Sequence, residues 1–245
     1  MKLEELLEHT AKDFLDDRTD LVDGDPDELW SNKVVVRYFN EAQRRLCRRA
    51  WVLVDTSHPQ AGRIVLATGK TLYPLHKSVL KVLAVTPTGQ LAPLAHSTDA
   101  RLAGRLPEDP DDFDASLVEP ITPGPPLAIS TDAGTRLLRV APAPAVAQNG
   151  LVVALKVARM PSCDLTIDKM DAEPEVPEEW HLEVISKYAA GKCLTHPNVD
   201  DSAKTEGRRL LAEVEAAIHE ARQERIRLWS APSKFWFAST TACLG

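Results

Sequence analysis

Gly69, Lys70 and Thr71 end like a phosphate-binding loop, the glycine-rich turn whose backbone amides and lysine hold nucleotide phosphates. The pattern G-x-x-x-x-G-K-T requires a glycine at position 64, which is Ile64 here, and Gly62 stands two residues too early. The surrounding residues also alternate as strand, turn and strand, whereas this loop joins a strand to a helix. We therefore predict a β-turn here and no nucleotide site.

Trp180 and His181 stand among acidic residues, a composition that suits acid–base catalysis or metal binding. Zinc ligation from a helix needs a second histidine at fixed spacing, as in H-E-x-x-H, and none follows His181. We expect His181 to be a solvated residue at the start of a helix. The sequence also has no nucleophile-elbow, kinase or dinucleotide-binding pattern. It therefore predicts a protein that is not an enzyme.

The aspartate-rich segment 20–27 fails the calcium-loop pattern, because Asp23 and Asp25 flank Gly24 and no bidentate glutamate follows at the required distance. The cysteines are scattered, without C-x-x-C or a Cys/His pairing at zinc spacing: Cys47, Cys163, Cys193 and Cys243. We expect reduced thiols, no metal and no cofactor.

Arginine is the basic residue that stands out, because Arg37, Arg44 and Arg48 share one side of a predicted helix and Trp51 falls near them. Arginines so placed can contact DNA phosphates, pair with acidic groups of a neighbouring subunit, or simply be solvated. We favour the subunit interface, with the acidic N-terminal arm as a natural partner. An aromatic residue on this side fits an interface better than open solvent, unless the helix has already ended.

Charge is unevenly spread along the chain, whose 245 residues have a net charge of −7. Residues 1–30 hold eleven acidic and three basic residues, so they contribute −8 and the remainder about +1. A protein that coats nucleic acid would show a basic surplus. No secretory leader or membrane-length apolar run is visible, so we expect a soluble protein made in the cytoplasm.

The element that must position the arginines is a long amphipathic helix predicted over 31–54. Its apolar face needs partners, and the only comparable helices are predicted far downstream, over 177–196 and 200–229; a short amphipathic helix is also predicted over 2–17. That apolar face comprises Val35, Phe39, Ala42, Leu46, Ala50 and Leu53. Gly207 lies on the apolar face of the last helix, where it either allows a close helix contact or is a tolerated strain.

Strand-like alternation dominates from residue 62 to 161, with Gly, Pro, Asp and Asn turns between the strands. We predict an inserted small antiparallel β domain, a sandwich or barrel, interrupted at 97–114. The fold is thus expected to be α+β, a bundle of long amphipathic helices with this insertion and an extended C-terminal tail. The predicted divisions are N-terminal helical 1–60, β-rich 61–162, C-terminal helical 163–230 and tail 231–245.

The tail carries three consecutive aromatic residues, Phe235, Trp236 and Phe237. They would be exposed on a free tail, and exposed aromatic clusters usually mark a partner surface. We favour docking on another chain over folding back onto the body.

Three blocks resemble the head-to-tail adaptors of tailed bacteriophages, the connector or tail tubular protein A type, most like those of short-tailed phages. The blocks are LWSNKVVVRYFNEAQRRLCRRA, LLRVAPAPAVAQNGLVVALKVARMP and VPEEWHLEVISKYAAGKCL, followed by a long helix. Within them, the family's N-E-A-Q-like motif, R-x-P strand end and Pro-acid-acid-aromatic-His helix start match Asn40 to Gln43, Arg159 to Pro161, and Pro177 to His181.

The resemblance implies a structural virion protein of the neck, a ring usually of twelve subunits that lines the DNA exit channel between portal and tail. Its implied partners are the portal protein, a tail tube or nozzle protein and other copies of itself. Genomic DNA would pass through the lumen without sequence-specific binding, and no membrane is involved. A C-terminal extension reaching the portal makes Phe235, Trp236 and Phe237 anchor candidates by position.

Two other functions stay open. The chain is alternatively another neck or tail completion component, or a DNA-binding regulatory protein whose arginines contact phosphates. The second alternative predicts salt-sensitive binding to duplex DNA.

Overall fold

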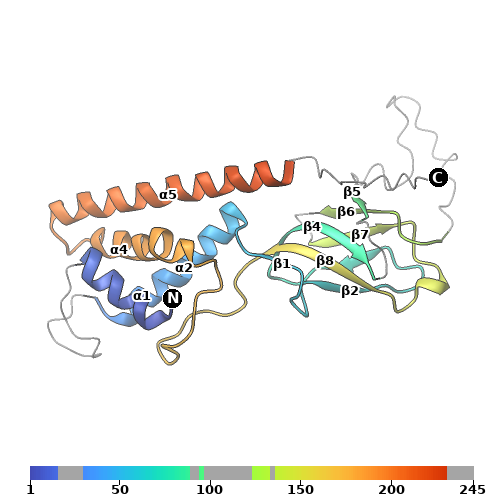
Figure 1. The fold of residues 1–245 in the computed structure, drawn as a ribbon, viewed down its shortest axis with the longest axis horizontal. Coiled ribbons are helices and arrows are strands. Elements are labelled where there is room, and N and C mark those ends of the chain that lie inside the picture. The colour runs from blue at the N-terminus through green and yellow to red at the C-terminus, as the bar shows by residue number, and fades with distance from the viewer. Residues whose placement is uncertain (16–29, 89–93, 97–122, 133–135, 231–245) are drawn as a thin grey trace, which may run out of the picture.

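The computed structural model describes residues 1–15, 30–88, 94–96, 123–132 and 136–230. It is an elongated molecule with helices gathered at one end and strands at the other (Figure 1). The combination of helices with small, mainly antiparallel sheets confirms the predicted α+β class. Among the helices so described, none is long and apolar enough to span a membrane.

The helical part begins with α1 (Leu3–Thr10), which continues into the π-helical turn η1 (Ala11–Leu15). The central helix is α2 (Asn32–Ala50). After the strands, the chain returns through the π-helical turn η5 (His181–Ser186) into α4 (Lys187–Leu194), and α5 (Asp201–Ser230) runs above them (Figure 1).

One core holds these helices together, and its buried side chains come from residues before position 53 and after position 164. The predicted apolar face of α2 supplies its centre, since Phe39 and Leu46 are fully buried and Val35, Ala42 and Ala50 are buried with them. The short α1 adds Leu3, Leu6 and Leu7. Burial of about 1.5–3 kcal/mol for each large apolar side chain is what stabilises helices that would be marginal alone.

The end of α2 differs from the prediction, because the helix stops at Ala50 and does not continue to residue 54. Trp51 adopts the left-handed conformation, with φ 54° and ψ 38°, and its N–H donates to Cys47 O at 3.0 Å. Leu53 is therefore not on the helical face, and Val54 already belongs to a strand.

The last helix matches its predicted extent closely. Leu210, Val214, Ile218 and Ala221 are buried along one side. Beyond Ala221 none of the described side chains of α5 is buried, and the helix continues past the end of α4 (Figure 1). These last turns therefore lie outside the core.

Gly191 of α4 and Gly207 of α5 face each other where the two helices pack together. A Cβ on Gly207 would lie 3.0 Å from Gly191 O, and a Cβ on Gly191 would lie 3.0 Å from Gly207 O. The close helix contact that we considered for Gly207 is therefore present.

The β part contains two sheets. In the first, β8 (Val152–Arg159) pairs along one edge with β1 (Val54–Asp55) and β2 (Arg63–Val65), and along the other with β4 (Val79–Pro87), all antiparallel. The second has the order β3 (Leu72–Pro74), β7 (Leu137–Ala141), β6 (Ala128–Asp132) and β5 (Ala95–His96). Its short β5–β6 pair is parallel, unlike the predicted antiparallel arrangement.

Both sheets contribute side chains to one core, so they pack as a sandwich. Val82, Val85 and Leu155 come from the first sheet, and Ile129 and Leu138 from the second. The predicted interruption at 97–114 lies outside the described residues.

The predicted turn at Gly69 is confirmed, and Gly69 has a positive φ of 71° that suits glycine. Tyr73 holds this turn, because its hydroxyl accepts from Ala67 N–H at 3.0 Å and lies 2.9 Å from Lys70 O, to which it donates. The segment joins β2 to β3 and not a strand to a helix, as a phosphate-binding loop would.

Candidate subunit interface

The three predicted arginines, Arg37, Arg44 and Arg48, lie on the outer side of α2. We call them the arginine ridge. At about 100° per residue they fall roughly half a turn away from the buried Phe39 and Leu46. All three arginines are exposed. The helix thus positions them away from the core, as the sequence predicts.

Their contacts within the chain differ. Arg44 forms an ion pair with Asp164, on the segment that follows β8. Arg37 stacks on Tyr38, its guanidinium carbon 5.1 Å from the ring centroid. Neither Arg37 nor Arg48 makes an ion pair with any residue in the described ranges. The intrachain pair of Arg44 was not predicted, because Asp164 is distant in sequence.

Two further arginines of α2 hold α5 in place. Arg45 Nε donates to Glu215 Oε1 at 2.7 Å, and Arg49 pairs with the other oxygen of the same carboxylate. Tyr188 of α4 donates its hydroxyl to Glu41, and burial together with this carboxylate raises the pKa of Tyr188. These contacts fix α2 relative to the two helices above it.

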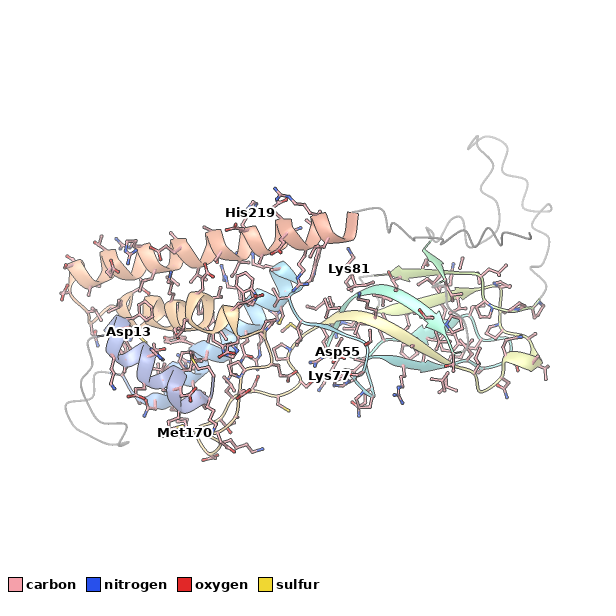
Figure 2. The ribbon with its side chains drawn as sticks, viewed as in Figure 1. Asp13, Asp55, Lys77, Lys81, Met170 and His219 are labelled. Atoms are coloured by element: carbon pink, nitrogen blue, oxygen red, sulfur yellow. The ribbon has the colours of Figure 1, made fainter. Side chains whose placement is uncertain are left out.

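Trp51 lies at the junction of three elements, half-buried just after α2. Its ring is contacted by Lys81 Nζ of β4 at 4.7 Å from the centroid and by the Arg222 guanidinium carbon of α5 at 5.5 Å. Lys81 lies where the sheets approach the helices (Figure 2). Since the helix has ended, Trp51 is not part of the arginine ridge, and its cation–π contacts explain why an aromatic residue sits on a polar side.

The left-handed backbone of Trp51 gives a stability prediction. Because a side chain in this conformation costs about 1–2 kcal/mol that glycine avoids, Trp51→Gly should be more stable than Trp51→Ala by about 1 kcal/mol. Urea unfolding followed by circular dichroism measures the difference. The same pair of substitutions at Arg37, within α2, should give the opposite order, since glycine is about 1 kcal/mol worse than alanine inside a helix. Equal stability of the two Trp51 variants would contradict the prediction.

A basic hollow of about 520 Å³ continues the arginine ridge toward the sheets. Arg48 lines it together with residues of the loops around it: His58, Gln60, His76, Lys77, Ser78, Leu80, Arg136, Met160, Pro161 and Ser162. His76 Nδ1 lies 2.8 Å from Ser78 Oγ and accepts the Ser78 N–H, which leaves Nε2 as the protonated nitrogen of the neutral ring. Sequence reasoning missed this cluster, because its residues come from five separate segments.

Arg159 forms a buried charge network that the sequence also did not reveal. Its Nε donates to Asp55 Oδ2 at 2.9 Å and its Nη1 to Glu175 Oε2 at 2.6 Å, while its side chain is 9% exposed. Nη1 also lies 2.9 Å from Ser162 Oγ. Asp55 lies where the strands begin (Figure 2). The network joins β1, the end of β8 and the segment that returns to the helices.

The carboxylates of this network are held ionised. Burial raises the pKa of Asp55, but hydrogen bonds from Ser57 and from Arg159 outweigh it and lower the pKa to about 2. Burial likewise opposes ionisation of Glu175, whose pKa is nevertheless lowered by Arg159 and by two backbone N–H donors, those of Cys163 and Ser162. A buried, fully paired group of this kind is typical of a structural junction.

The expectation for His181 is wrong. Its side chain is 2% exposed, its Nε2 donates to Val176 O at 2.9 Å, and burial lowers its pKa. A signal was present in the sequence, because His181, Ile185 and Tyr188 recur at the spacing of one helical face. His181 is therefore a buried residue of the helical part and not a solvated helix end.

Two of the scattered cysteines lie inside helices, Cys47 in α2 and Cys193 in α4. Cys47 and Cys193 are buried and unpaired, and burial raises both thiol pKa values to about 12. Cys163 is exposed and also unpaired, and Cys243 lies outside the described residues. Within those residues no group of three or more His, Cys, Asp or Glu side chains is arranged to hold a metal ion.

Phe235, Trp236 and Phe237, the portal-anchor candidates, lie outside the described residues, as do the acidic segment 20–27 and the rest of the tail.

Comparison with known families gives a match over most of the chain. Residues 1–234 match the family model of the SU10 adaptor protein, so the match covers the helices and both sheets. No curated protein matches the chain. The match does not extend to Phe235, Trp236 and Phe237, and the likeness to short-tailed phages in particular stays a prediction.

Proposed function

The chain belongs to the SU10 adaptor family, structural proteins that join head and tail in the neck of a bacteriophage virion, and from this premise we propose that it forms a ring between the portal and the tail. The proposed ring has twelve subunits and lines the channel through which DNA leaves the head. The observation that carries the proposal is the family match, which runs through residues 1–234.

In this proposal the helical segments 1–60 and 163–230 form a bundle that makes the body of the ring. The inserted segment 61–162 faces outward or toward the tail, where a tail tube or nozzle protein binds. Separate cores for helices and strands support this assignment, because each part then keeps its shape while the other contacts a partner. DNA passes the lumen without sequence-specific binding.

Subunit contacts are assigned to the arginine ridge, with Trp51 beside it. The support is the exposure of Arg37, Arg44 and Arg48 on the outer side of a helix whose other sides are packed. Arginine is enriched at protein interfaces because its planar group binds carboxylates through two hydrogen bonds.

Portal binding is assigned to residues 231–245, with Phe235, Trp236 and Phe237 as the anchor. Aromatic side chains bury large apolar areas and dominate binding energies at interfaces. The support is compositional: three consecutive aromatic residues stand among small and polar ones.

The experiment is a titration of purified portal rings with the full chain, with a chain ending at Ser230, and with the triple variant Phe235→Ala, Trp236→Ala and Phe237→Ala. We expect ring-on-ring complexes for the full chain, and a roughly tenfold or larger increase in the half-saturating concentration for both changed proteins. The control is Ser239→Ala, Thr240→Ala and Thr241→Ala, which should bind like the full chain.

Two outcomes would redirect the assignment. Absence of any complex with the full chain would overturn the portal adaptor and favour another neck or tail completion component. Salt-sensitive binding of the chain to duplex DNA, weakened by Arg37→Ala with Arg48→Ala, would favour the DNA-binding alternative.

A further inference from the structure

A groove of about 410 Å³ runs between the start of η5 and the C-terminal half of α5. Its rims carry four exposed carboxylates, two from each side: Glu179, Glu183, Glu220 and Glu224. Its lining also includes apolar residues, among them the half-buried Trp180 and the buried Ala221. We call it the acidic groove.

Among the residues that the structure describes, no basic side chain is paired with the carboxylates of the acidic groove. None of the four forms an ion pair with a residue that the structure describes, and Arg225 is the basic side chain among the lining residues. Glutamates elsewhere on α5 are paired: Glu213 with Lys187 and Arg209, and Glu215 with two arginines of α2. The groove therefore keeps a negative charge that a cationic partner would offset.

The groove also ends in exposed apolar surface. Leu228 lines it and is 58% exposed, on the turns of α5 that extend past the core. A helix that continues beyond its own core with a large apolar side chain uncovered is typical of a surface that a partner covers. The exposed carboxylates and the exposed Leu228 thus both indicate that a partner covers this groove.

The arginine ridge fits the charges of this groove. Arg44 and Arg48 are four residues apart, so they project about 6 Å apart along one helix side. Glu220 and Glu224 have the same spacing on one rim, and so do Glu179 and Glu183 on the other. A helix laid in the groove would place its arginines between two rows of carboxylates, within reach of charge-assisted hydrogen bonds.

The two surfaces lie on different sides of the helical part. Glu215 and Arg222 mark the side of α5 that faces α2, because they contact Arg45, Arg49 and Trp51. Glu220 and Glu224 line the groove on another side of α5, next to η5. A subunit with two different complementary surfaces makes head-to-tail contacts, and such contacts close into a ring when the rotation between subunits permits.

We propose that the acidic groove between η5 and α5 receives the arginine ridge of a second copy of this chain. This inference rests on the proposed ring and names the two surfaces that meet in it. The ridge of each subunit lies in the groove of the next, and Leu228 is covered in the contact.

The test is a charge exchange in the full chain. Glu220→Arg with Glu224→Arg reverses the groove, and Arg37→Glu with Arg48→Glu reverses the ridge without disturbing an ion pair of the described residues. Mass photometry on portal rings gives the number of subunits bound at each concentration. Each double variant should raise the half-saturating concentration roughly tenfold or more, because like charges then face each other.

Combining all four substitutions should recover part of the lost assembly, about threefold or more over either double variant, since the exchanged side chains again attract each other while Arg44, Glu179 and Glu183 keep their charges. Asp168→Arg with Asp171→Arg is the matched control, because it makes the same charge change at exposed sites on either side of Met170, which lies across the helical part from α5 (Figure 2), and it should assemble normally. Normal assembly of the groove variant, or no recovery in the fourfold variant, would overturn the proposal.

A further measurement distinguishes failure of this contact from failure of the proposed binding to the portal. If the unchanged chain does not bind portal rings, its self-association measured by sedimentation still reports the contact, and the same variants must weaken it and recover. The competing occupant is the chain's own tail. If the groove reversal weakens self-association of the full chain but not that of a chain ending at Ser230, the tail fills the groove and the proposal is wrong.

Discussion

Replacing Arg159 by methionine is expected to lower the free energy of unfolding by about 3–5 kcal/mol, the cost of leaving buried charges without their partner. Asp55 and Glu175, with side chains 15% and 26% exposed, would lose their guanidinium and keep little access to water. Urea unfolding of the full chain measures the loss. Arg63→Met is the matched control, because Arg63 is an exposed arginine on β2, and it should change stability by about 0.5 kcal/mol or less.

The same network sets an acid dependence. The folded-state pKa of Asp55 is about 2 and that of Glu175 is also lowered, so both carboxylates bind protons more weakly folded than unfolded. Their contribution is therefore complete above the unfolded pKa of about 4 and is lost as the pH falls toward 2. Arg159→Met should flatten this acid loss. An unchanged slope between pH 4 and pH 2 would show that Arg159 does not hold these groups.

A further variant separates lost pairing from lost packing. Adding Asp55→Asn and Glu175→Gln to Arg159→Met removes the stranded charges, so it should recover part of the loss. No recovery would mean that the Arg159 side chain acts mainly by filling space.

Apolar residues that recur at helical spacing over many residues made much of the helical part predictable. The apolar side of α2 recurs over many residues, and Val35, Phe39 and Leu46 are buried as their spacing indicates. The end of α2 was not predictable, because Trp51, Val52 and Leu53 continue an apolar run and no glycine follows Ala50. The chain turns there through a left-handed tryptophan, which its contacts with Lys81 and Arg222 stabilise.

Contacts between segments far apart in the sequence are the part of the candidate interface that the sequence could not predict. The exposure of the arginine ridge follows from one helix, so the sequence predicts it. The acidic groove needs two helices whose facing rims, at Glu183 and Glu220, are far apart in the chain, and no local pattern brings them together. Arg159 was missed for the same reason, because its partners lie 104 and 16 residues away.

Gly207→Val is expected to lower the free energy of unfolding by about 3 kcal/mol, and Gly207→Ala by about 1–3 kcal/mol. A Cβ at Gly207 would lie 2.9 Å from Leu194 Cβ and 3.0 Å from Gly191 O, so α4 and α5 would have to separate. Valine adds two methyl groups to this contact. Thermal and urea unfolding measure both changes. Ala216→Val is the control, since Ala216 is exposed on the same helix and valine costs only about 0.7 kcal/mol there.

Whether Gly207→Ala raises or lowers the free energy of unfolding decides between the two explanations of this glycine. A glycine that is merely tolerated in a helix gains about 1 kcal/mol when replaced by alanine, whereas one at a close contact loses stability. Gly191→Ala tests the same contact from α4, where the new Cβ would lie 2.8 Å from Leu211 Cγ. Because one separation of the helices accommodates both methyl groups, the double variant Gly191→Ala with Gly207→Ala should lose less than the sum of the single losses. Simple additivity would mean that the two glycines act independently.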